Sequence, residues 1–434
     1  MRAIDVLGEN MSGTTTSYRE RVRDTTSGFF QQYGLAFVMV ASYFGSGSIF
    51  IASSAGVRFG YALLWAVVGA ALLGFMAQDM SARLGIFGEP LMVFVRKKLG
   101  GRIATVLAVV LSSGCLLWAF ELTAAVGKGL SLLVGGAVGW MPLAVLTGFA
   151  AVAVGLLNYE GIEQLMTAMM IGLLVVYLFV TGTTAPPLSA IATGFVPSVP
   201  GVGALTLVAS ILGTTALWPN FFLESNLVAE KGWSGRSDIT PMRRDLGIGY
   251  AVGGITTIAI LVLAAAVLRP AGYTELETFL TPGRALGNVI GEWARTVFLV
   301  GAVAAAFNSI IPIMWTPSYL FQHARGTEAD SASRSFKAIY ALLVSISGLS
   351  PLITIFFGLG VIDMIILFPA YNAIVGLPIT AALLFWAVND ENTMGEHRNT
   401  RLLSVLNAAL VVLAVVSATT SLPGVVDALL SGGL

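Results

Sequence analysis

Long apolar runs separated by short polar connections make up most of the chain. About eleven of the runs reach roughly 20 residues, the length that a helix needs to cross a hydrocarbon core of about 30 Å. The pattern therefore predicts an all-α membrane protein with about eleven transmembrane helices. The predicted spans are residues 29–54, 60–82, 103–133, 139–158, 164–183, 203–228, 246–268, 294–321, 336–358, 361–387 and 402–423.

Small and polar residues interrupt two of these spans near their middle. In span one the interruption is Phe44-Gly45-Ser46-Gly47-Ser48, and in span six it runs from Gly213-Thr214-Thr215 to Trp218-Pro219-Asn220. Broken helices at corresponding places in two halves of a chain are typical of a transporter, and they meet at its substrate site. We therefore expect spans one to five and six to ten to form inverted repeats with broken helices 1 and 6.

The connections between spans are too short to hold a separate soluble domain. Residues 1–27 are polar and mixed in charge, so we interpret them as a cytoplasmic tail. Residues 28–434 would then form a single transmembrane domain. Within it, one repeat covers about 28–184, the second about 200–388, and a last helix about 402–423.

Composition and charge agree with a membrane protein. Of 434 residues, 56% are hydrophobic and only 11% are charged, whereas a soluble domain has roughly a quarter charged residues. The net charge is +0, which gives no reason to expect binding of nucleic acid. Of the 23 Lys and Arg residues, 18 fall on the side of the N-terminus and four on the other side. Because basic connections resist translocation, this asymmetry predicts a multi-pass protein of the cell (inner) membrane with a cytoplasmic N-terminus and an external C-terminus.

The two interruptions supply the candidate substrate-binding groups. An unwound helix exposes backbone N–H and C=O groups that must find partners in protein, water or substrate. The start of the second half of helix 1 favours an anionic group, and the end of its first half favours a cation or an amino group. The predicted substrate-binding residues are Ser42, Gly45, Ser46, Gly47, Ser48, Thr214, Thr215, Leu217, Trp218, Asn308 and Asn372.

Two acidic residues lie deep within predicted spans, Glu121 in span three and Glu224 in span six. Ionisable groups inside a membrane are costly and therefore point to function. We predict that both take part in proton coupling, and we keep the alternative that Glu121 pairs with Lys128, two turns later on the same face. Asp79 lies near a span end, so we expect it to be solvated.

The residues that usually bind metals or catalyse reactions are scarce in the spans. The only cysteine, Cys115, is expected to be a buried apolar group. His323 and His397 both fall in predicted polar connections, so no histidine ligand is expected within the membrane. We therefore predict no enzyme activity, no cofactor and no bound metal. The expected partners are a small-molecule substrate, protons and the lipid bilayer, and we expect a monomer.

Several motifs resemble those of the Nramp metal-ion transporters and their magnesium- and aluminium-transporting relatives, over nearly the whole chain. This resemblance implies the inverted-repeat fold of LeuT-type amino-acid transporters and, usually, import coupled to protons. The matching segments are Ser42 to Tyr61, Ser81-Ala82-Arg83-Leu84-Gly85-Ile86, Ile211-Leu212-Gly213-Thr214-Thr215, Leu223-Glu224-Ser225-Asn226-Leu227-Val228, and Asn389-Asp390 with Met394-Gly395-Glu396-His397-Arg398-Asn399.

The metal-binding motifs of that family are replaced in this chain. Gly45-Ser46-Gly47-Ser48 stands where the family has Asp-Pro-Gly-Asn, and Leu217-Trp218-Pro219 stands where it has Met-Pro-His. The resemblance places Glu224 at the family's second histidine and Glu121 at an aspartate of its proton route. The chain thus resembles a divergent member of the family that lacks its sulfur, imidazole and carboxylate ligands at the breaks.

Three hypotheses for function follow. The first is a proton-coupled secondary transporter for a small organic solute that carries a carboxylate, with an aromatic acid as one example. The alternative is a transporter of a divalent cation, Mg²⁺ or Mn²⁺, held by carbonyl and hydroxyl groups and by Glu224. The third is a membrane sensor that does not transport.

Overall fold

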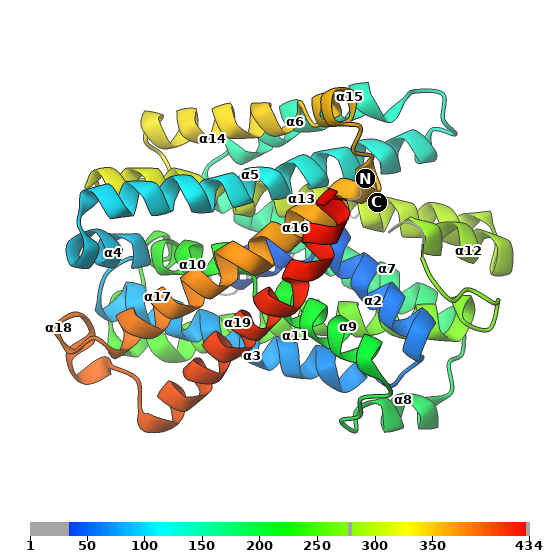
Figure 1. Ribbon diagram of the computed structural model, residues 1–434, viewed down its shortest axis with the longest axis horizontal. Helices are drawn as coiled ribbons and strands as arrows, with labels where there is room; N and C mark the ends of the chain where they lie inside the picture. Colours follow the sequence, from blue (N-terminus) through cyan, green and yellow to red (C-terminus); the bar gives the residue numbers. More distant parts are fainter. Residues whose placement is uncertain (1–33, 277–279, 431–434) are drawn as a thin grey trace, which may run out of the picture.

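The computed structural model describes residues 34–276 and 280–430. The predicted tail at residues 1–27 lies outside this part of the chain. The described residues form a bundle of helices, and most of the long helices run along its longest axis (Figure 1).

The predicted number of membrane spans agrees with the helices of the described part. Eight helices are long and apolar enough to cross a membrane, two bent helix pairs pass the same test together, and Trp140–Gly155 is a shorter apolar helix. These elements correspond to the eleven predicted spans. The fold class predicted from the sequence is therefore confirmed.

The first half of the chain begins with a broken helix and contains the long helix α5. Helix 1 consists of Gly34–Tyr43 and α2 (Ser46–Phe59), which are bent by 66° relative to each other. The elements that follow, up to the second break, are α3 (Leu64–Phe87), α4 (Leu91–Leu99), α5 (Gly101–Leu133), α6 (Trp140–Gly155), α7 (Tyr159–Thr183) and α8 (Leu188–Gly194).

The second half begins with the other broken helix, α9 (Val202–Thr215) and α10 (Trp218–Glu230). Its long central helix, α13, packs along α5 (Figure 1). The remaining elements are η1 (Arg236–Asp238), α11 (Ile239–Leu263), η2 (Ala264–Leu268), α12 (Thr281–Val289), α13 (Glu292–Arg325), α14 (Arg334–Ser347), α15 (Pro351–Phe357), α16 (Val361–Tyr371), η3 (Asn372–Gly376), α17 (Leu377–Asn389), α18 (Glu391–Met394), η4 (Gly395–His397) and α19 (Arg401–Leu430).

Local sequence accounts for several helix boundaries. The side chain of Asn158 accepts the Gly161 N–H at the start of α7, and Ser333 accepts the Phe336 N–H at the start of α14. Gly326 ends α13 with φ of 80°, a conformation that glycine adopts without strain. Inside α13, Pro312 and Pro317 remove two backbone donors from a helix that is otherwise continuous.

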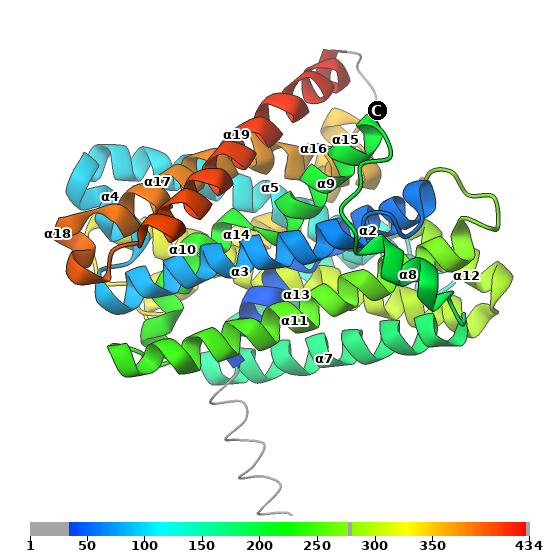
Figure 2. The same ribbon diagram turned by 90° about the horizontal axis from the view of Figure 1, so that it is seen from below.

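Close packing at two glycines of α11 holds the first half of helix 1 in place. A Cβ atom at Gly249 would lie 2.6 Å from Cβ of Ala36, and one at Gly253 would lie 2.1 Å from the Tyr43 hydroxyl oxygen. At the N-terminal end of the same half-helix, the Ala36 N–H donates to Oδ2 of Asp245 at 2.9 Å. Helix 1 therefore approaches its break with its first half fixed against α11, while α19 lies at the edge of the bundle (Figure 2).

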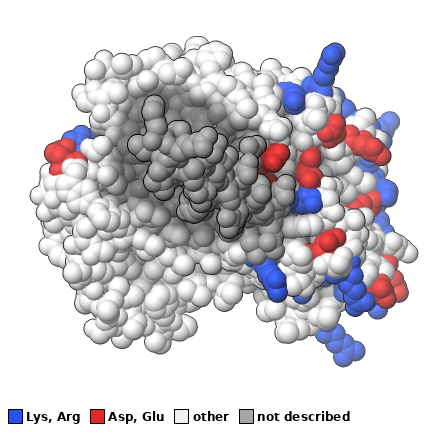
Figure 3. Space-filling view, turned by 180° about the vertical axis from the view of Figure 1, so that it is seen from behind, with Lys and Arg blue, Asp and Glu red and all other residues white. Residues whose placement is uncertain are grey.

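Charged side chains are distributed unevenly along the bundle. On the face shown in Figure 3 they gather at one end, the end that carries α4 and α18 in Figure 1. At this end Lys98 Nζ lies 2.7 Å from Oδ2 of Asp390, and this hydrogen bond lowers the pKa of the Asp390 carboxyl. The predicted solvation of Asp79 is wrong, because its carboxylate is buried and pairs with Arg83 at 3.0 Å and Arg243 at 2.7 Å.

Candidate functional site at the two helix breaks

The break in helix 1 is shorter than the sequence indicates. Only Phe44 and Gly45 separate the two helical halves, and Ser46, Gly47 and Ser48 form the first turn of α2. The Ser48 hydroxyl donates to the Tyr43 carbonyl at 2.7 Å and so connects the two halves across the break. Gly45 is the N-cap of α2 and has no side chain to accept the first N–H groups. The polar groups of the break are thus concentrated in one helical turn.

Glu121 reaches this break from α5. Its Oε1 accepts a hydrogen bond from the Ser46 hydroxyl, and both side chains are buried. Its Oε2 has no hydrogen-bond partner among the described residues. The predicted alternative, pairing with Lys128, is wrong, because Lys128 is exposed and forms no ion pair with a described residue. One carboxylate therefore lies at the centre of the bundle beside the unwound segment.

Helix α13 approaches the same break from another side. Ser309 Oγ donates to the Ala41 carbonyl at 2.6 Å, and a Cβ atom at Gly45 would lie 2.9 Å from Ser309 Oγ. These contacts place Asn308 and Ser42, the chain neighbours of the two bonded residues, at the level of the break. In the described part of the chain, Ser42 Oγ and both polar side-chain atoms of Asn308 lack hydrogen-bond partners although they are buried. The break thus has oxygen groups that are not used by the fold.

The second break is equally short and is followed directly by a buried aromatic side chain. Only Ala216 and Leu217 separate α9 from α10, so the expectation that residues 213–215 unwind is wrong. Thr214 and Thr215 each donate a side-chain hydrogen bond to a carbonyl of their own helix, at 3.1 and 2.8 Å. Trp218 is 1% exposed, and its Nε1–H donates to Oδ1 of Asn372 at 2.9 Å.

The two breaks lie next to each other; α5 contacts the first directly and is linked to Trp218 at the second through Asn372. Asn220 Nδ2 donates to the Met39 carbonyl at 3.0 Å, which joins α10 to the first half of helix 1. Asn372 Nδ2 donates to the Gly114 carbonyl of α5 at 3.1 Å, two turns before Glu121. The structure therefore brings Ser46 to Glu121 and Trp218 to Asn372. Asn220 was predicted as the end of the second interruption, but it was not among the predicted substrate-binding residues, and its link to Met39 was not expected.

Glu224 lies apart from these pairs on α10. It is completely buried, and both of its carboxyl oxygens lack hydrogen-bond partners within the described ranges. Two residues further along α10, Oδ1 of Asn226 lies 2.6 Å from His323 Nε2. His323 is buried in the last turn of α13, so the expectation that it lies in a polar connection is wrong. Over residues 34–276 and 280–430, no group of three His, Cys, Asp or Glu could hold a metal ion.

A bundle with two adjacent broken helices and buried polar groups between them defines a membrane transporter of the LeuT type. Comparison with known proteins then gives the family. The chain matches the family described as natural resistance-associated macrophage protein-like (Nramp) over residues 36–422, so it belongs to this family. Nramp proteins are transporters and not enzymes, as the sequence predicts.

Relatives and solved structures agree with this assignment. The chain is 28% identical over 286 residues to the divalent metal cation transporter MntH of Yersinia enterocolitica, covering 64% of this chain and 69% of that one. It is 27% identical over 286 residues, covering 64% and 68%, to the protein of the same name from Pectobacterium carotovorum. The structure of the Eremococcus coleocola manganese transporter superposes with a TM-score of 0.76 at 18% identity, covering 92% of this chain and 88% of that one. MhsT in complex with L-phenylalanine gives a TM-score of 0.60 at 17% identity, covering 90% and 98%, which shows the shared fold.

Proposed function

We propose that this Nramp transporter moves a divalent metal cation across the membrane by secondary transport coupled to protons. The name of its relatives from Yersinia enterocolitica and Pectobacterium carotovorum, divalent metal cation transporter, supports this substrate class. This assignment reverses the order of the hypotheses drawn from the sequence, in which an organic carboxylate came first and a divalent cation was the alternative.

The observation that carries the proposal is the position of Glu121. Its carboxylate lies against Ser46 in the first turn of α2, at the place where helix 1 is broken. Ser42 and Asn308 add buried oxygen atoms at the same level. Hard cations such as Mg²⁺ and Mn²⁺ prefer carboxylate, carbonyl and water oxygens, and Mg²⁺ usually keeps several of its waters. A partly hydrated ion of this kind is therefore a better match for the break than a metal that needs sulfur or imidazole.

Proton coupling is assigned to the two buried glutamates. A cation that binds Glu121 competes with a proton for the same carboxylate. Binding of the cation should therefore release the proton, and protonation of Glu121 should weaken cation binding. Glu224 lies on α10, on the way from the break to the end of the bundle that carries α4. We propose that it passes the released proton towards that end, and Glu224→Gln should make cation uptake insensitive to an imposed pH gradient. Uptake by Glu224→Gln that still rises with the gradient would refute this role.

The charge asymmetry of the ends supports the orientation with a cytoplasmic N-terminus and an external C-terminus. A protease site appended after Leu434 should then be cut when protease is added to intact cells. Protection of the site would indicate the opposite orientation.

Metal uptake into proteoliposomes tests the substrate class. The wild-type protein should accumulate radioactive Mn²⁺, with competition by Mg²⁺, and Glu121→Gln should reduce the initial rate about tenfold or more because the ion loses its only carboxylate at the break. Glu292→Gln is the matched control, since Glu292 is an exposed carboxylate that pairs with Arg295 at 3.0 Å away from the site. Equal uptake by wild type and Glu121→Gln would contradict the proposed role of Glu121.

A small organic carboxylate is the second candidate, favoured by one observation. The first turn of α2 presents the N–H groups and hydroxyls of a helix start, which favour an anion, and the buried Trp218 lies at the adjacent break. Ser46→Asp separates the two candidates. It adds a negative charge to the break, so it should preserve or raise Mn²⁺ uptake if the substrate is a cation, and it should abolish uptake if the substrate is an anion.

A further inference from the structure

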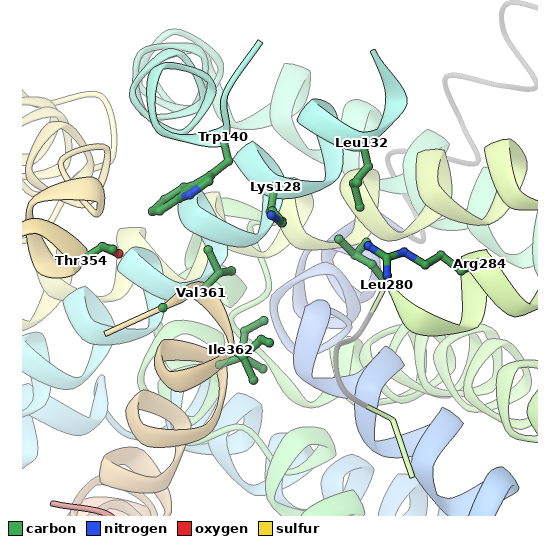
Figure 4. A pocket seen from close by; sticks show the side chains of 10 residues that line it. Lys128, Leu132, Trp140, Leu280, Arg284, Thr354, Val361 and Ile362 are labelled. Carbon is green, nitrogen blue, oxygen red and sulfur yellow. The ribbon is translucent and has the colours of Figure 1, made fainter. Parts of the chain in front are cut away.

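A cavity of about 260 Å³ lies at the end of the bundle opposite α4, away from the helix breaks (Figure 4). Five segments form it: the last turns of α5, the start of α6, the start of α12, the short helix α15, and the start of α16. The charge distribution predicts that this end faces the outside. Its lining residues are Lys128, Leu132, Trp140, Leu280, Arg284, Thr354, Gly360, Val361, Ile362 and Ile365.

Two basic side chains, Lys128 and Arg284, line the cavity from different helices. Figure 4 shows both side chains reaching towards the same space, Lys128 from α5 and Arg284 from α12. Neither forms an ion pair with a residue of the described ranges, in contrast to Arg83, Arg243 and Lys98 at the opposite end. Within the described ranges, the cavity therefore presents two basic side chains that are not held in an ion pair.

The neighbouring acid is already engaged. Asp363 lies in the first turn of α16, and its Oδ2 accepts the Gly360 N–H at 2.6 Å. This carboxylate caps its own helix. Among the described residues that line the cavity, two are basic and none is acidic, which disfavours a metal cation and favours an anion.

The rest of the wall is apolar and specifies the body of the ligand. Trp140 and the aliphatic side chains of Leu132, Ile362 and Ile365 surround the two cations. A carboxylate can accept two parallel hydrogen bonds from a guanidinium, and an apolar wall strengthens such charge-assisted bonds by excluding water. Inorganic phosphate or sulfate would leave this wall without a partner. We propose that the cavity binds a small organic carboxylate with an apolar or aromatic body, at a site separate from the metal site at the helix breaks.

Calorimetric titration of the purified full-length protein with benzoate tests this inference. Benzoate should bind in the absence of metal, and benzamide, which has the same shape without the charge, should not bind. Lys128→Gln and Arg284→Gln should each weaken benzoate binding about tenfold or more, because each removes one charge-assisted hydrogen bond. The matched control is Arg295→Gln, which removes a basic residue at the same end that is paired with Glu292 and does not line the cavity.

A variant at the helix breaks tests whether benzoate binds in the cavity and not at the breaks. Glu121→Gln should leave benzoate affinity unchanged, because Glu121 lies at the break and does not line this cavity. No measurable benzoate binding to the wild type, or equal binding by Lys128→Gln, Arg284→Gln and the wild type, would overturn the inference. Mn²⁺ uptake is measured separately on the same variants, so failure of the carboxylate site and failure of the metal site give different results. Unchanged melting temperatures of the variants ensure that a loss of binding is not a loss of folding.

Discussion

The two helix breaks differ in the polar groups that surround their unwound backbone. Unwinding a helix inside a membrane leaves backbone groups without partners, and these must be satisfied locally. The break in helix 1 is flanked by hydroxyls and the Glu121 carboxylate, and several of its buried polar atoms lack partners in the described structure. The break between α9 and α10 is followed directly by the buried Trp218, whose single N–H is already bonded to Asn372. The comparison indicates that the first break is arranged for a ligand and the second for packing.

Truncation of Trp218 should have the largest effect on stability. Trp218→Ala removes a side chain that is 1% exposed and also leaves Asn372 Oδ1 without its donor. We expect a loss of about 3–5 kcal/mol in the free energy of unfolding, measured by thermal or denaturant unfolding in detergent. Trp293→Ala is the control, since Trp293 is 44% exposed and should tolerate truncation in the same assay. Equal small losses for both variants would show that the second break does not depend on aromatic packing.

Glycine substitutions compare the two breaks directly. A Cβ atom at Gly45 would lie 2.9 Å from Ser309 Oγ, whereas one at Gly213 would meet nothing within 4 Å. Gly45→Ala should therefore cost about 1–3 kcal/mol through overpacking, and Gly213→Ala, inside α9, should be neutral or stabilising. Unfolding of the two single variants measures the difference.

A second substitution tests the cause of the Gly45 effect. Ser309→Ala removes the hydroxyl that the new methyl group would meet, so the double variant Gly45→Ala with Ser309→Ala should lose less stability than the sum of the single variants. Strict additivity would mean that the clash with Ser309 is not the reason.

Loss of the hydrogen bond across the first break should have the smallest effect. Ser48→Ala removes the donor to the Tyr43 carbonyl, and a neutral hydrogen bond contributes about 0.5–1.5 kcal/mol. Thr215→Ala removes a comparable hydroxyl bond within α9, which does not cross a break. If Ser48→Ala alters Mn²⁺ uptake and Thr215→Ala does not, the link between the two halves of helix 1 matters for transport. Identical effects on uptake would remove that distinction.

The sequence predicted the broken helices but overestimated their length. Gly and Ser at positions 45–48, and Gly and Thr at 213–215, have low helix propensity in isolation, yet most of them remain helical here. Tertiary packing overrides propensity at these positions: Thr214 and Thr215, for example, satisfy their hydroxyls on their own helix. The number of spans was predictable because apolar length is a strong signal.

Contacts between distant segments were not predictable from hydropathy. The hydrogen bond from Ser46 to Glu121 depends on the packing of α5 against helix 1. The hydrogen bond from Asn220 to Met39 depends on the packing of α10 against the first half of helix 1. The position of His323 was predicted wrongly because the last turn of α13, which ends at Arg325, is polar. Hydropathy therefore placed the end of the span before His323. The exposed position of Lys128 was hidden by the apolar run around it, in which helical spacing alone suggested a pair with Glu121.

Pro312 leaves the first helix break with a backbone oxygen that can accept a hydrogen bond or bind a cation. A proline has no N–H, so the Asn308 carbonyl lacks its usual donor four residues later in α13. That carbonyl remains an acceptor at the level of the break whatever residue replaces Asn308. The residue that makes this carbonyl available is Pro312, one helical turn away. A variant designed to change the acceptors at this break would therefore need a substitution at position 312 as well as changes to the surrounding side chains.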